Sequence, residues 1–247
     1  MSLTLAELAI HIPASIVLFE KYGLDYYQCG QRVFEEVCLQ EGLSHEELEK
    51  EMSRLQSEMQ TAYPVTLAEM DIGGLIDFLN GQYHSDEKQA LSEIHSQIRQ
   101  LLDGDLPENI KVSLTEIEKN FLLLSRKLLE HCHKEDLVIF PYMRRLSELR
   151  RKKMPVLAYP ELALIRNPLS ILEDENEDTL RILAGIKNTA KGFLSPPDAS
   201  GEYMQLMVSF KEFERDLHIH LHIENNILFP RVKELLKELQ EGLDTRS

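Results

Sequence analysis

Two histidine–glutamate pairs recur in this sequence with the same spacing. His131 and Glu135 are four positions apart, as are His220 and Glu224, and a Phe-Pro dipeptide begins five residues after each glutamate. Residues i and i+4 of a helix differ by roughly 40° in rotation and about 6 Å in rise, so each pair projects from one face. Imidazole and carboxylate donors held this way suit non-haem iron, and zinc or manganese would also fit. One such pair is common on a helix surface, but two matched copies predict a metal site.

Other histidines lie close to these pairs. His133 and His222 follow the first histidine of each copy by two residues, which turns them about 200° round the helix. We interpret both as non-ligands, either in solvent or behind the ligands. His218 is similarly turned away from His220, and the alternative is a loose surface chelate made by the histidines at 218, 220 and 222. His84 is a lone helical histidine, and its spacing alone does not make it a ligand.

Long helices are needed to position the two pairs. Amphipathic periodicity runs through about 67–103, 111–151, 161–192 and 202–240, and Gly-, Asp- or Pro-containing breaks separate these segments. Strand-like alternation is nearly absent. Long helices joined by short connections favour antiparallel neighbours. We therefore expect an all-α protein with an up-down-up-down four-helix bundle, whose second and fourth helices carry the two pairs.

The first 60 residues carry shorter helical patterns. Ser44 and Glu47 are spaced as a capping box at the start of one of them. Pro64 disfavours helix at the residue before it, which suggests a boundary there. We expect a small helical N-terminal domain at 1–62 and the bundle at 66–242.

The overall composition excludes some classes of function. The chain has 27 Lys and Arg against 42 Asp and Glu, a net charge of −15, which opposes binding to nucleic-acid phosphates. It has no long apolar run, and its N-terminus lacks the order of a signal peptide, so we expect no membrane association and a cytoplasmic location. The three cysteines are too few and too scattered for a disulfide framework or a Cys-rich zinc site.

Three segments resemble one known family. The first is Glu7–Gly30, the second is Leu128–Pro141, and the third is Asp216–Arg231, which contains the sequence ENNILFPR. Together they are similar to the hemerythrin-like iron–sulfur cluster repair family, which comprises di-iron proteins linked to recovery from nitric oxide and oxidative stress. The resemblance covers nearly the whole chain.

The resemblance implies roles for the paired residues. It makes His131 and His220 terminal iron ligands, Glu135 and Glu224 the carboxylates that bridge two irons, and His84 the ligand from the first long helix. Two iron ions are the expected cofactor, and a single ion is the alternative.

The third long helix departs from the family pattern. Asn176 stands where the family has a histidine ligand, and a neutral amide is a poorer donor to iron than imidazole. Asn176 could coordinate through its amide oxygen, leave the position to water, or restrict the site to one iron. Glu173 and Glu177 are candidate replacements, although an acidic run on a helix is usually a solvated face. His95 lies too far along its helix to substitute easily.

The cysteines also depart from the family. Cys29 stands alone where the family has a Cys-Cys pair before glycine, which puts thiol chemistry by the N-terminal domain in doubt. Cys38 is typical of a small buried hydrophobic residue. Cys132 lies within a ligand segment, one position off the expected metal face.

These features favour a stress-response iron protein whose partners are nitric oxide, oxygen or peroxide, together with the damaged iron–sulfur proteins that it repairs. One alternative is a module that binds or senses oxygen or nitric oxide, or stores iron. Another is a degenerate relative with a mononuclear site, which Asn176 supports. A homodimer is left open, and so is whether the protein is an enzyme.

Overall fold

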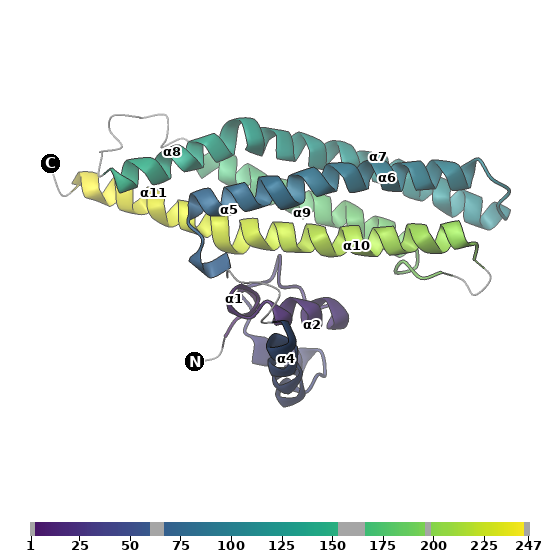
Figure 1. Cartoon of the computed structure of the whole chain (residues 1–247), viewed down its shortest axis with the longest axis horizontal. Coiled ribbons are helices and arrows are strands. Elements are labelled where there is room, and N and C mark those ends of the chain that lie inside the picture. Colours follow the sequence, from purple (N-terminus) through teal and green to yellow (C-terminus); the bar gives the residue numbers. More distant parts are fainter. Residues whose placement is uncertain (1–2, 60–66, 153–165, 196–198, 245–247) are drawn as a thin grey trace. The chain divides into compact units, whose positions relative to one another are not determined.

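The computed structural model describes residues 3–59, 67–152, 166–195 and 199–244 (Figure 1). Over these ranges every regular element is a helix, and the only pairing of strand type is an isolated antiparallel bridge between Thr4 and Val33. The all-α prediction is confirmed. None of the helices in the described ranges is both long enough and apolar enough to cross a membrane.

The chain forms two compact units. The first contains residues 1–77, 143–163 and 218–247, and the second contains 78–142 and 164–217. The predicted domain boundary at 62–66 lies outside the described residues and stays a prediction.

Four long helices make up most of the second unit. Lys127 on one helix pairs with Asp178 on another at 3.1 Å, and Lys187 pairs with Glu214 at 2.8 Å. Aromatic contacts in the core include an edge-on pair between Phe121 and Phe210. The helices are α6 (Ser85–Leu102), α7 (Glu108–Lys134), α9 (Arg166–Thr189) and α10 (Gly201–Ile223) (Figure 1).

The sequence explains where α7 begins and which face it buries. Pro107 directly precedes the helix, where a residue without a backbone N–H removes no helical hydrogen bond. Apolar side chains then recur every three or four positions, which gives one continuous buried stripe. The stripe consists of Leu114, Ile117, Phe121, Leu124 and Leu128, and it leads directly to His131.

Three of the long helices continue beyond these bounds through π-helical turns. The full helical spans are 72–102, 108–151 and 201–244, close to three of the predicted segments. The third predicted segment is helical from 166 to 189, and its first five residues lie outside the described ranges. The additional elements are α5 (Ile72–Phe78), η2 (Leu79–His84), η3 (Glu135–Ile139), α8 (Phe140–Arg151), η6 (Glu224–Leu228) and α11 (Phe229–Asp244).

Short N-terminal helices belong to the first unit. Their core includes Phe19, whose ring contacts the rings of Tyr26 and Phe34. A complete capping box begins the first helix, where Thr4 and Glu7 exchange side-chain and backbone hydrogen bonds of 2.8 and 3.1 Å. At the predicted box, the N–H of Glu47 donates to Ser44 Oγ at 3.3 Å. The helices are α1 (Leu5–His11), α2 (Ala14–Tyr22), α3 (Phe34–Gln40) and α4 (His45–Met59).

Candidate metal centre

Each helix that carries a predicted histidine or glutamate ligand changes to a π-helical turn beside it. His84 ends η2, Glu135 begins η3 and Glu224 begins η6. A π turn inserts one extra residue and is frequent at functional sites. The helix that carries Asn176, α9, has no such turn from Arg166 to Thr189. The local backbone therefore distinguishes the three ligand-bearing helices from the fourth.

The repeated Phe-Pro dipeptide follows from this backbone. The N–H of Phe140 donates to the carbonyl of Glu135, and the N–H of Phe229 donates to that of Glu224, so both bonds span five residues. A proline has no N–H to continue the usual four-residue pattern, and it is tolerated where that pattern is already interrupted. Phe140 also stacks on the His84 ring, with centroids 5.6 Å apart.

In the second unit, two imidazoles converge on one carboxylate. Nε2 of His84 and Nε2 of His131 each lie 3.4 Å from Oε2 of Glu135. All three side chains are buried, with at most 1 % of each residue exposed. Two imidazole nitrogens and one carboxylate oxygen thus meet at one point inside the protein.

The other nitrogen of each ring is held by a second carboxylate. Nδ1 of His84 lies 2.7 Å from Oδ1 of Asp136, and Nδ1 of His131 lies 3.1 Å from Oε2 of Glu175. An ionised carboxylate only accepts, so each Nδ1–H donates to it, and a neutral ring then has its lone pair on Nε2, the nitrogen that faces Glu135. This is the arrangement that fixes ring orientation in metal-binding histidines.

The carboxyl group of Glu175 has a low pKa. The hydrogen bond from His131 lowers the pKa of Glu175 to about 2, and Lys134, which also contacts this carboxylate, adds to the shift. Burial acts in the opposite direction but is outweighed. The carboxylate is therefore charged at neutral pH and holds the His131 ring.

The second predicted pair is also buried. Nε2 of His220 lies 2.9 Å from Oε1 of Glu224, and neither residue has exposed surface. Like His84 and Glu135, each of these two residues can offer one ligand atom to a metal ion.

The donor set fits a cation. Both oxygens of Glu135 are buried, and no group in the described part of the chain donates a hydrogen bond to either. A buried anion without donors is costly unless a positive charge balances it. A metal ion bound by imidazole nitrogens and carboxylate oxygens would supply that charge. The residues present therefore fit metal binding.

Asn176 and the three residues considered as its replacements differ in how far they are buried. Asn176 is 1 % exposed and faces the core. Glu177 is exposed and pairs with Arg181 at 3.2 Å, whereas Glu173 is half-buried. His95 is partly exposed, and its Nε2 lies 3.7 Å from Glu118 Oε1.

The histidines flanking His220 do not form a surface chelate, so that alternative is wrong. His218 and His222 are buried, because N-terminal residues of the same unit cover them. Nδ1 of His218 lies 2.9 Å from Glu20 Oε1, and its ring stacks on Tyr27 at 3.8 Å. His222 packs against the Tyr26 ring at 5.3 Å. By contrast, His133 in the first copy is exposed.

The cysteines agree in part with the predictions. Cys38 is buried in the N-terminal core as expected, and Cys29 is exposed. Cys132 is also buried, and its thiol donates to Glu87 Oε2 at 4.0 Å. Asp136, Glu175 and Glu87 all contact residues of the ligand segments, yet no sequence motif points to them. Their partners lie on other helices, so no local spacing could indicate them.

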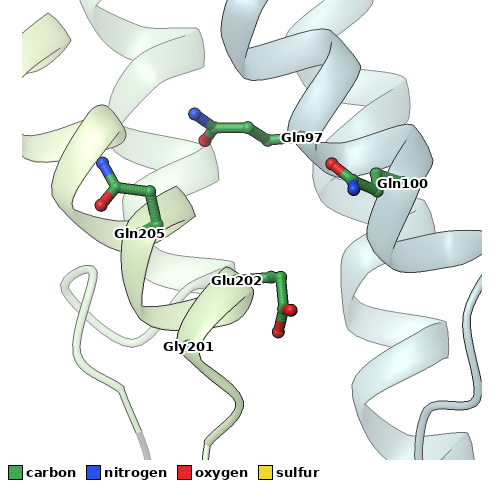
Figure 2. A pocket seen from close by; sticks show the side chains of 5 residues that line it. All are labelled: Gln97, Gln100, Gly201, Glu202 and Gln205. Carbon is green, nitrogen blue, oxygen red and sulfur yellow. The ribbon is translucent and has the colours of Figure 1, made fainter.

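A pocket of about 310 Å³ lies away from the predicted ligands. Gln97 and Gln100 of α6 and Glu202 and Gln205 of α10 line it, together with Gly201 (Figure 2). Gln97 is about 20 Å along the helix from His84 at 1.5 Å per residue. The pocket is therefore separate from the candidate metal centre.

Comparison with known proteins agrees with this chemistry. Residues 86–232 match the family described as Hemerythrin HHE cation binding domain. The Iron-sulfur cluster repair protein YtfE of Enterobacter sp. (strain 638) is 28% identical over 228 residues, covering 92% of this chain and 94% of the relative. The Probable iron-sulfur cluster repair protein of Haemophilus influenzae is 26% identical over 230 residues, covering 92% and 95%. The predicted resemblance is confirmed, and the chain belongs to the hemerythrin family of HHE cation-binding domains.

Proposed function

We propose that this protein binds non-haem iron, as a di-iron centre, and supports the repair of damaged iron–sulfur clusters under nitrosative or oxidative stress. The observation that carries the proposal is the convergence of His84 and His131 on the buried, donor-free carboxylate of Glu135. The repair role is supported by the names of the relatives, which match 92% of the chain.

In this proposal, five residues are the metal ligands. His84, His131 and His220 would hold iron through Nε2, and Glu135 and Glu224 would hold it through carboxylate oxygens. Bound iron would supply open coordination positions and a change of oxidation state for reaction with nitric oxide, oxygen or peroxide.

The chain's own residues prepare the site for this chemistry. Asp136 and Glu175 accept the Nδ1 protons and so keep the metal-facing nitrogen of two imidazoles unprotonated. Phe140 covers one face of the His84 ring and keeps water from it. A dry, rigid site strengthens the interaction between the carboxylates and a cation.

Metal analysis of protein from iron-replete cells tests the cofactor. We expect about two irons per chain and a large loss of iron in Glu135→Gln. The matched control is Glu130→Gln, an exposed glutamate five residues earlier on the same helix, which should retain its iron. About one iron per chain would instead support the degenerate mononuclear variant, and no iron would contradict the proposal.

A second experiment separates repair from sensing. The iron-loaded protein is added to a cluster enzyme damaged by nitric oxide, and recovery of that enzyme's activity is followed. We expect recovery with the wild-type protein and none with His220→Ala or with an equal amount of free iron. Reversible gas binding without recovery would favour the sensor.

A further inference from the structure

Glu87 is a buried carboxylate in the second unit that the proposed ligand set leaves unused. It lies three residues after His84, on the core-facing stripe that Leu91 and Ile94 continue along α6. Only 3 % of it is exposed. Metal sites in helical bundles are built from carboxylate and imidazole side chains that project into the core from facing helices.

The pairing of α6 with α7 sets the level of Glu87 in the core. His84 contacts Asp136 at 2.7 Å, and Glu87 contacts the thiol of Cys132 at 4.0 Å. One turn forward along α6 thus corresponds to one turn back along α7, as in any antiparallel pair. Glu87 therefore lies at the level of Cys132 and of the adjacent His131.

Helix α9 contributes to the same level. Glu175 contacts Nδ1 of His131 at 3.1 Å, which places this turn of α9 beside His131. The next residue, Asn176, is buried and faces the core. One layer of the core thus holds the imidazole of His131, the amide of Asn176 and the carboxylate of Glu87.

We infer that Glu87 is a further metal ligand, which supplies a carboxylate to the ion bound by His131 in place of the imidazole that Asn176 lacks. A carboxylate oxygen is a hard anionic donor and binds iron better than a neutral amide does. This inference rests on the proposed function, because it adds a ligand to the same centre.

Metal content of the full chain tests the inference. Wild type, Glu87→Gln and Glu214→Gln are loaded with ferrous iron without oxygen, and iron per chain is measured after removal of the excess. Glu214 is a matched control, because it is also a buried glutamate of the second unit and pairs with Lys187 at 2.8 Å. We expect Glu87→Gln to hold about half the iron of wild type and the control to hold all of it.

A rescue variant shows whether the loss is specific to the missing ligand. Glu87→Gln combined with Asn176→His should recover the wild-type iron content, because the imidazole returns to the same layer. If the single variant does not fold, the double variant decides: wild-type content supports the inference, and half the content overturns it. Cys132→Ala should leave iron unchanged, and a loss there equal to that of Glu87→Gln would overturn the inference in favour of the thiol.

The outcomes also separate this inference from the proposed function. A wild-type protein that binds no iron contradicts both. Wild-type protein that binds iron, alongside a Glu87→Gln variant with the same content, overturns the role of Glu87 alone.

Discussion

Oε2 of Glu175 on α9 lies 3.1 Å from Nδ1 of His131 on α7, so an acid on one helix fixes an imidazole on another. The bond also lowers the pKa of Glu175 to about 2. A carboxylate with so low a pKa is fully ionised at neutral pH and remains the acceptor for the ring proton. The orientation of His131 therefore depends on a residue that binds no metal in the proposed site.

Glu175→Gln should weaken metal binding. A neutral amide accepts the Nδ1–H less strongly and can also donate to the ring, so the Nε2 lone pair is held less firmly. Loss of such a partner typically costs about 10–100-fold in metal affinity. Competition with a chelator measures the change, and Glu177→Gln, exposed on the same helix, is the control. Equal affinities in the two variants would contradict the role given to Glu175.

Asp136→Asn should act in the same way through His84. Asp136 Oδ1 lies 2.7 Å from Nδ1 of His84, and Asp136 Oδ2 lies 3.4 Å from Nζ of Lys88. We expect the metal to dissociate about 10–100-fold faster into excess chelator. The control is Asp86→Asn, because Asp86 is an exposed residue whose side chain contacts Gln82 at 3.3 Å. A dissociation rate no faster than that of the control would rule out a role for Asp136 in holding the ring.

The helices were predictable from the sequence because their buried apolar residues recur every three or four positions, as on α7. The two ligand pairs were visible because each is local and repeated. The π turns at Glu135 and Glu224 were not predicted, although the Phe-Pro dipeptide that follows each glutamate belongs to the repeat. Asp136 and Glu175 could not be found, since their roles depend on contacts across helices 52 and 44 positions apart in sequence.

The flanking histidines show a different limit of sequence reasoning. Helical periodicity places His218 and His222 on a different face of the helix from His220. It could not reveal which residues cover the face that carries His218 and His222. In the first unit Tyr26 and Tyr27 lie against these rings, and Asn226 donates to the backbone carbonyls of both tyrosines at 3.2 Å. A face that periodicity would assign to solvent is therefore buried.

His222 should make the metal-free protein sensitive to acid. Burial lowers the pKa of His222 to about 4, from 6.5, and a hydrogen bond with the Tyr26 backbone only partly opposes this. Between pH 6.5 and 4 the unfolded chain binds a proton that the folded chain does not. Stability therefore falls as pH decreases through this window, by about 3 kcal/mol in total for a shift of this size.

The measurement compares urea unfolding of metal-free wild type, His222→Gln and His133→Gln at pH 7.5 and 4.5. Carboxylates titrate in all three proteins, so the difference between them isolates the histidine. His222→Gln should lose less stability on acidification than wild type does. His133→Gln should behave as wild type, because His133 is exposed at the corresponding position of the first copy. Identical losses in all three would refute the assignment to His222.

Gly30→Ala should loosen the contact between the N-terminal loop and η6 within the first unit. A Cβ at residue 30 would lie 2.6 Å from the carbonyl oxygen of Tyr26 and 2.7 Å from Oδ1 of Asn226. The backbone oxygen cannot move aside cheaply, so we expect a loss of about 1–3 kcal/mol in unfolding free energy. The amide of Ala6, which donates to the carbonyl of Gly30 at 2.8 Å, should exchange its hydrogen faster.

Gly185→Ala is the matched control for this substitution. Gly185 lies inside α9, and a Cβ there meets no atom within 4 Å. Because alanine is the better helix former, this variant should gain roughly 0.5–1 kcal/mol. Opposite signs for the two glycine substitutions would tie the cost to the close approach at Gly30. A Gly30→Ala protein as stable as wild type, with unchanged exchange at Ala6, would mean that the loop does not depend on this contact.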